Sequence, residues 1–216
     1  MSECEMVVRE KFGGTLESVD QRQFVDEDFE KGVWSDLDLK GCQFERCRFR
    51  GVRLTELHTQ GCEFTECDFA GAFLACSVHR SASFLNCKFD NADLFSARFE
   101  NCRVIGCGFE GANLAAMDIQ RGDWSYVSMR YQELDGRDFR GVRFKGTDFV
   151  GASLKKSDLR DCLLDEASLL HTKFQEADLR GASLDKTDLR HAEWKGARLD
   201  IGQAVHFAQC FGIVVE

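Results

Sequence analysis

Large apolar residues recur at every fifth position of this 216-residue chain, from Phe24 to Leu199, without a slip in the frame. Of the 36 positions in this register, 14 are Phe, 14 are Leu and three are Trp, and only Thr59 and His79 break the rule. A residue that is usually small lies two positions before each large one. Neither a helix, with 3.6 residues per turn, nor a strand, which alternates every two residues, gives a period of five. The pattern therefore predicts a solenoid in which each five-residue segment is one wall of a coil.

Glycine marks the predicted corners of these coils. Twelve of the 19 glycines lie two positions after the large residue, as at Gly41 and Gly141. We expect this position to be a corner, because glycine tolerates the positive φ of a type II turn. The absence of proline suits a backbone whose ladder between coils needs every amide donor.

The segments around Leu154, Leu159 and Leu179 read Gly-Ala-Ser-Leu-Lys, Lys-Ser-Asp-Leu-Arg and Glu-Ala-Asp-Leu-Arg. They resemble the pentapeptide-repeat family, and the resemblance covers residues 22–201. It implies an all-β fold, a right-handed quadrilateral β-helix with four pentapeptides per coil and about nine coils, in which residues 20 apart stack. We expect residues 1–21 to cap the N-terminal end of this solenoid, because an open coil end exposes apolar surface and strand edges.

The C-terminal residues leave the period of five. Residues 200–211 predict a short helix ended by Gly212, followed by a strand-like segment at 213–215. Residues 202–216 carry more apolar surface than the end of one coil needs, which predicts a two-fold homodimer through this end. The predicted interface residues are Val205, Ala208, Phe211, Ile213, Val214 and Val215.

Cysteine is abundant, but its positions argue against disulfides and metal. We expect reduced thiols that pack as compact hydrophobes, because the chain has an odd number of cysteines and no secretion signal. Cys4, Cys76 and Cys210 lie outside the inward positions. The other eight of the 11 occupy the small inward position: Cys42, Cys47, Cys62, Cys67, Cys87, Cys102, Cys107 and Cys162.

The sequence holds no nucleophile motif, phosphate-binding loop or cofactor fingerprint, so we predict a binding protein that is not an enzyme and needs no cofactor or metal. His171 and His191 stack in the repeat and are expected to be solvated corner residues. His79 takes a core position directly above Thr59. Two stacked polar residues in an apolar column cost free energy unless they pair or turn outward, and we expect a local bulge there.

Charged residues offer one candidate surface. The net charge is −9, and no uncompensated basic stripe exists, which disfavours direct nucleic-acid binding. The repeat predicts an acidic column beside an arginine column at Arg140, Arg160 and Arg180. This arrangement is either a partner-binding surface or a self-neutralising charge ladder that serves solubility. The acidic column consists of Asp118, Asp138, Asp158 and Asp178.

Phe73 and Phe95 form a second candidate surface, because both occupy outward positions of the same wall. An exposed aromatic pair lowers solubility unless something covers it. Two interpretations remain open: contact with a partner, and cover by an irregular N-terminal segment.

No apolar run approaches the length of a membrane span, and the N-terminus lacks the features of a signal peptide, so we expect a cytoplasmic protein that does not contact the membrane.

The tail at 196–215 carries a further resemblance. Its pairs Gln203-Ala204, Phe207-Ala208 and Gly212-Ile213, after a Gly-Ala-Arg-Leu coil, resemble the topoisomerase-protecting subfamily of the MfpA and Qnr quinolone-resistance proteins. The resemblance implies a tail-to-tail dimer that forms an acidic DNA mimic, occupies the DNA-binding saddle of DNA gyrase or topoisomerase IV, and counters quinolone-type poisons. Qnr proteins of Gram-negative bacteria have loops that interrupt the frame, whereas this chain has none. The alternative is a pentapeptide-repeat scaffold or immunity protein with a different partner.

Overall fold

The computed structural model describes residues 20–30 and 32–215. It divides into two compact units, residues 1–118 and 119–216, and each is described by itself. The predicted N-terminal cap, 1–21, lies outside the described residues except for its last two positions.

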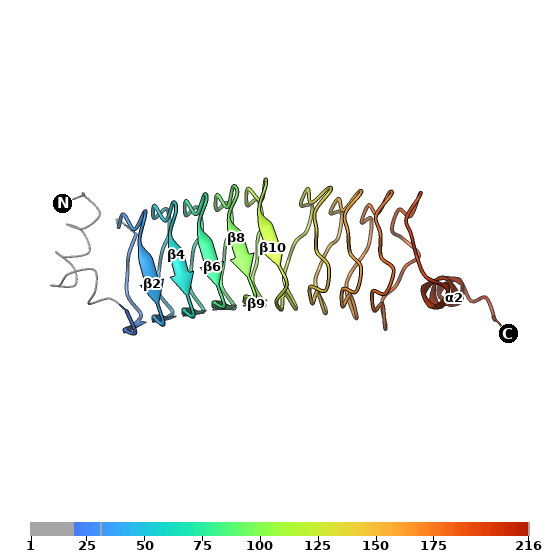
Figure 1. Ribbon diagram of the computed structural model, residues 1–216, viewed down its shortest axis with the longest axis horizontal. Helices are drawn as coiled ribbons and strands as arrows, with labels where there is room; N and C mark the ends of the chain where they lie inside the picture. The colour runs from blue at the N-terminus through green and yellow to red at the C-terminus, as the bar shows by residue number, and fades with distance from the viewer. Residues whose placement is uncertain (1–19, 31, 216) are drawn as a thin grey trace. The chain divides into compact units, whose positions relative to one another are not determined.

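The described part of the first unit contains short parallel strands on two of its walls (Figure 1). Strands of one wall pair in a register of 20 residues, so that Phe24 lies beside Phe44 and Leu39 beside Thr59. One sheet has the order β1 (Gln23–Val25), β3 (Gln43–Glu45), β5 (Glu63–Thr65), β7 (Ser83–Leu85) and β9 (Arg103–Ile105). The other has the order β10 (Asp118–Gln120), β8 (Arg98–Glu100), β6 (Val78–Arg80), β4 (His58–Gln60) and β2 (Asp38–Lys40).

Each strand is only three residues long because the corners interrupt it, and only its middle residue is buried. The other two walls keep the same 20-residue register through single bridges, such as Phe73 to Asp93. In the described second unit, beyond Gln120, bridges of this kind hold the walls, and the helix α2 (Ile201–Cys210) follows the last coil. The predicted quadrilateral β-helix is confirmed.

The core is built from columns of stacked side chains. Phe69, Phe89 and Phe109 stack with ring centroids 4.9 and 4.8 Å apart and almost parallel planes. Phe84, from the neighbouring wall, meets Phe89 edge to face at 5.8 Å. These distances are typical of favourable aromatic packing, and they confirm the predicted register.

Nearly every described corner position has a positive φ, whether or not glycine occupies it. All twelve corner glycines have φ between 60° and 77°, and 22 other residues at equivalent positions have φ between 48° and 61°. The type of turn therefore does not depend on glycine. Glycine only removes the steric cost, about 1 kcal/mol, that an L-residue meets in this region.

The small inward position does more than fill space. Its hydroxyl and thiol groups donate to backbone carbonyls 23 residues earlier, on the preceding coil, as from Thr172 to Phe149 (2.8 Å) and from Cys67 to Phe44 (3.4 Å). The prediction that these thiols act only as hydrophobes was incomplete, because the carbonyls of the previous coil point at them. The described cysteines are all free thiols.

The predicted C-terminal helix is confirmed, and Gln203 attaches it to the last coil. Asp200 and Gln203 form a capping box, in which each side chain accepts the other residue's backbone N–H. The Gln203 amide also donates to the carbonyls of Leu179 (2.6 Å) and Ala182 (2.7 Å). Gly212, with φ of 76°, ends the helix in a Schellman motif.

The strand predicted at 213–215 is not formed. The Ile213 N–H donates to the Ala208 carbonyl to close the helix, and the following residues are exposed coil. A strand needs a neighbour to pair with, and the described chain offers none at this position.

Candidate partner-binding surfaces

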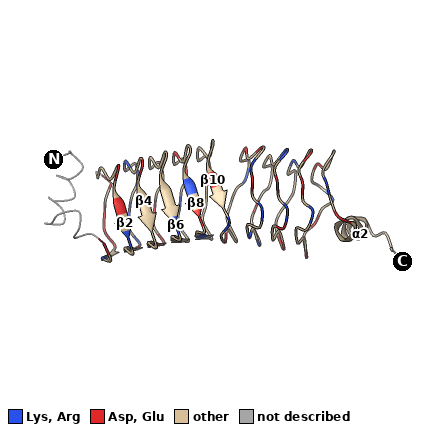
Figure 2. Cartoon of the chain, viewed as in Figure 1, with Lys and Arg blue, Asp and Glu red and all other residues tan. Residues whose placement is uncertain are grey.

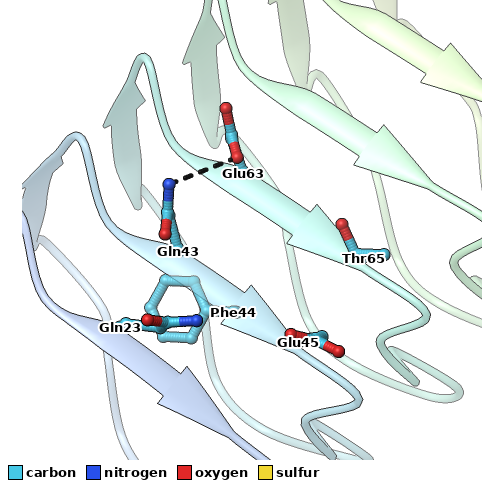
Figure 3. A pocket seen from close by; sticks show the side chains of 6 residues that line it. All are labelled: Gln23, Gln43, Phe44, Glu45, Glu63 and Thr65. Atoms are coloured by element: carbon cyan, nitrogen blue, oxygen red, sulfur yellow. Dashed lines mark hydrogen bonds between the residues drawn. The ribbon is translucent and has the colours of Figure 1, made fainter.

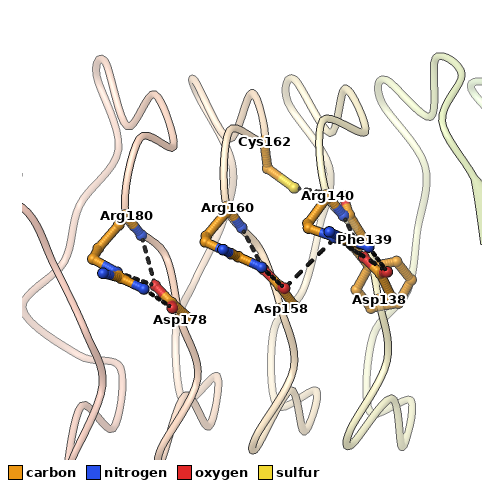
Figure 4. Close-up of polar contacts among 8 residues, drawn as sticks. All are labelled: Asp138, Phe139, Arg140, Asp158, Arg160, Cys162, Asp178 and Arg180. Atoms are coloured by element: carbon orange, nitrogen blue, oxygen red, sulfur yellow. Dashed lines mark hydrogen bonds and ion pairs between the residues drawn. The ribbon is translucent and has the colours of Figure 1, made fainter.

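The acidic column of the second unit is a row of bidentate ion pairs (Figure 4). Asp158 lies in register between Asp138 and Asp178. Each carboxylate accepts from Nε and Nη2 of the arginine two residues later, at 2.6 to 2.9 Å: the pairs are Asp138–Arg140, Asp158–Arg160 and Asp178–Arg180.

These arginines stabilise the ionised carboxylates. The hydrogen bonds from Arg180 lower the pKa of Asp178 to about 2, and the pKa values of Asp138 and Asp158 are lowered in the same way. Because each negative charge has its own guanidinium, this geometry favours the self-neutralising ladder over a strongly negative surface.

Asp118, the fourth predicted member of the column, belongs to the first unit. Its carboxylate lies 3.5 Å from Nε of the Arg98 guanidinium. On the same wall, β2 and β8 each carry one acidic and one basic end, as their red and blue segments show (Figure 2).

Phe73 and Phe95 are exposed as predicted, with 48% and 46% of their surface accessible. They come from successive coils of the first unit. Phe73 lies in register with Asp93, and the Phe95 N–H donates to the Asp93 carboxylate at 3.1 Å. The structure therefore brings these two residues together on one face around Asp93.

The predicted dimer residues form an apolar surface on the C-terminal helix and tail. Phe211, Ile213, Val214 and Val215 are exposed, Val214 at 82%, whereas Val205 and Ala208 are half-buried. Ile201, at 85%, is the most exposed large apolar side chain in the described residues, and it is not among the predicted interface residues.

His79 and Thr59 do not form the expected bulge. They face each other in register on β6 and β4, both buried, and the Thr59 hydroxyl lies 2.8 Å from His79 Nδ1. Ser77 Oγ lies 3.0 Å from the other ring nitrogen. The two polar residues pair inside the core, which removes the reason for the backbone to bulge.

His171 and His191 stack as predicted: the His171 N–H donates to the His191 carbonyl at 2.9 Å. The described residues contain no group of three or more side chains that could hold a metal ion. Nor do they contain a helix long and apolar enough to cross a membrane.

A shallow pocket lies over β1, β3 and β5 (Figure 3). Its volume is about 160 Å³, and Gln43 donates to Glu63 across it at 3.5 Å. Ligand pockets commonly enclose about 300–1,000 Å³, so this depression is small for an organic substrate. The remaining lining residues are Gln23, Phe44, Glu45 and Thr65.

Columns of stacked residues, parallel walls and a positive-φ corner every five residues define a quadrilateral β-helix of pentapeptides. The family model for pentapeptide repeats matches residues 62–101, 133–165 and 162–200. The chain belongs to the pentapeptide-repeat family.

Solved structures support the same fold. Two trypsin-treated forms of QnrB1, a plasmid-mediated fluoroquinolone resistance protein, align with TM-scores of 0.79 and 0.81 at 23% and 24% identity. The alignments cover 91% and 92% of this chain and 99% and 100% of QnrB1. HetL, involved in heterocyst differentiation regulation in the cyanobacterium Nostoc, aligns over 83% of this chain and 88% of its own, with a TM-score of 0.53 and 21% identity. A comparison with curated protein sequences gives no match.

Proposed function

We propose that this protein is a non-enzymatic DNA mimic that binds DNA gyrase or topoisomerase IV and protects it from quinolone-type inhibitors. The observation that carries the proposal is the extent of the likeness to QnrB1, a fluoroquinolone resistance protein, which spans nearly the whole of both chains. The resemblance of the tail around Gln203 and Gly212 to the topoisomerase-protecting subfamily supports it independently.

The protein would act by competing with DNA for a cationic protein surface. Residues 1–118 carry 21 acidic and 13 basic residues, so this unit has the negative charge that such competition needs. The same charge repels nucleic acid, and we do not propose direct nucleic-acid binding. Electrostatic association of this kind weakens as salt rises. A topoisomerase target would place the protein in the cytoplasm.

We further propose a homodimer through the C-terminal helix and tail. Ile201, Phe211 and the three apolar residues after Gly212 are exposed in the single chain. A second copy packed against them by a two-fold axis would bury this surface from both sides.

The test is a pull-down of purified gyrase A and B subunits, and of topoisomerase IV, across a salt titration. It is combined with a supercoiling assay in the presence of a fluoroquinolone. We expect binding that weakens with salt and supercoiling that persists at drug concentrations that stop the enzyme alone. Failure to bind either topoisomerase at low salt would reject this function.

The alternative is a scaffold or immunity protein that binds a different partner. HetL, a pentapeptide-repeat protein involved in the regulation of heterocyst differentiation, aligns with a TM-score of 0.53. The same architecture therefore also occurs outside drug resistance, which supports this alternative. Recovery of a partner other than a topoisomerase, with no effect on supercoiling, would support this alternative.

A further inference from the structure

The excess negative charge of this chain lies in one of its two units. Residues 1–118 contain 21 acidic and 13 basic residues, whereas residues 119–216 contain 16 and 15. The ladder of Asp138, Asp158 and Asp178 belongs to the second, nearly neutral unit, where each carboxylate has its own arginine. A surface that attracts cations must therefore be sought in the first unit.

One face of the first unit combines exposed aromatic rings with unneutralised acids. It consists of the outward residues of three successive turns, 70–76, 90–96 and 110–116, and we name it the aromatic face. These turns contain no Lys or Arg. Phe73 and Phe95 are about half exposed, and most other outward residues are small. The acids of the face are Asp90, Asp93 and Glu110.

The acids of the aromatic face form no ion pair with any described residue. The Asp93 carboxylate accepts from the Phe95 N–H at 3.1 Å and from the Asn113 amide at 2.8 Å, and Asp93 lies in register with Phe73. Among the backbone bridges between coils, the basic residues nearest to this face are Arg53, paired with Phe73, and Lys88, paired with Asp68. Both lie outside the three turns.

We infer that the aromatic face docks a cationic protein surface that presents Arg and Lys side chains. A guanidinium or ammonium group gains both from the carboxylates and from the face of an aromatic ring, and the ring also buries the apolar stem of the same side chain. A nucleic acid does not fit, because its phosphates would meet three carboxylates. This inference rests on the proposed function, in which the partner's surface is built to bind DNA phosphates.

The experiment compares three variants of the full chain for binding to gyrase by biolayer interferometry, at low and at physiological salt. One removes the rings (Phe73→Ala and Phe95→Ala), and one removes three charges of the aromatic face (Asp90→Asn, Asp93→Asn and Glu110→Gln). The matched control removes three charges of the ladder (Asp138→Asn, Asp158→Asn and Asp178→Asn). At the equivalent position of the next coil, the Asn113 side chain accepts a hydrogen bond from the Ala115 N–H, as the Asp93 carboxylate does from the Phe95 N–H. Asp93→Asn should therefore keep the turn.

We expect both aromatic-face variants to weaken binding at least tenfold, the charge variant with a reduced salt dependence, while the ladder variant stays within about twofold of the wild type. Wild-type affinity in either aromatic-face variant, or an equal loss in the ladder variant, would overturn the inference and leave the proposed function intact. So would nuclear Overhauser contacts in the free protein from either ring to residues 1–19, because the chain would then cover its own face.

If the wild-type protein binds no topoisomerase, the proposed function fails while the face can still be tested. The probe is then an arginine-rich peptide that contains tryptophan, titrated into the isotopically labelled protein. Shifts centred on Phe73 and Phe95, and lost in the charge variant, would support the inference. Shifts spread evenly over both units would reject it.

Discussion

The Thr59 hydroxyl and His79 Nδ1 lie 2.8 Å apart inside the core, in register on adjacent parallel strands. Ser77 contacts the other ring nitrogen, so one nitrogen of the neutral imidazole can donate while the other accepts. Burial disfavours the imidazolium form and lowers the pKa of His79 to about 3. The chain thus keeps a histidine in a phenylalanine-rich core, in its uncharged form.

This pair predicts that stability falls on mild acidification. Between pH 6.5 and about 3, the unfolded chain binds a proton at His79 that the folded chain does not. The free energy of unfolding should therefore have its full value above pH 6.5 and fall as the pH drops below it. We expect a decrease of about 2 kcal/mol between pH 7 and pH 5. Urea titrations at several pH values measure this slope.

The control is the double substitution Thr59→Leu and His79→Leu, which makes the column between Leu39 and Phe99 wholly apolar. It should remove most of the dependence between pH 5 and pH 7. If the double variant kept the wild-type slope, another group would be responsible.

Much of this fold could be predicted because one pattern repeats 36 times and each coil repeats the packing of the last. The same pattern gave the stacking of Phe89 between its neighbours and the exposure of Phe73 and Phe95. The pattern could not show how the two residues that break it interact. The repeat placed Thr59 beside His79, but it could not show whether the two side chains pair inside the core or turn outward, because that depends on their rotamers.

The ladder shows a second limit. The repeat predicts that aspartate and arginine occupy adjacent columns. It could not show whether a carboxylate such as that of Asp158 stays free to bind another protein or pairs with the arginine two residues later. That choice depends on the rotamer of a long side chain, and the structure shows Arg160 folded back onto Asp158.

The aromatic column predicts a large cost for a cavity. Phe89 is fully buried and contacts Phe69, Phe84 and Phe109. Phe89→Ala should lower the free energy of unfolding by about 3–5 kcal/mol, because the rigid coils on either side cannot close the space. An unchanged melting temperature would contradict the register of the repeat.

The small inward position predicts a separate, smaller effect. Thr172 is fully buried and donates to the Phe149 carbonyl of the preceding coil. Thr172→Val keeps the shape, and valine already occupies equivalent positions at Val52 and Val142, so the change isolates the hydroxyl. We expect a loss of about 1–2 kcal/mol in denaturant unfolding. Thr172→Cys should lose less, because a thiol can donate there, and equal stability of the valine variant and the wild type would show that the hydrogen bond contributes nothing.

The C-terminal surface predicts a dimer that a single charge can separate. Phe211 and Val214 are exposed in the single chain, at 53% and 82%, so an aspartate at either position should leave the coils intact. In the proposed dimer the same aspartate would be buried without a cation, which strongly destabilises association. Light scattering should give a dimer for the wild type and a monomer for Phe211→Asp and Val214→Asp, with unchanged circular dichroism. Lys195→Asp, in an exposed turn outside the helix and tail, is the charge control and should remain dimeric. If all three variants had the mass of the wild type, this surface would not be the interface, and the exposed tail would need another partner.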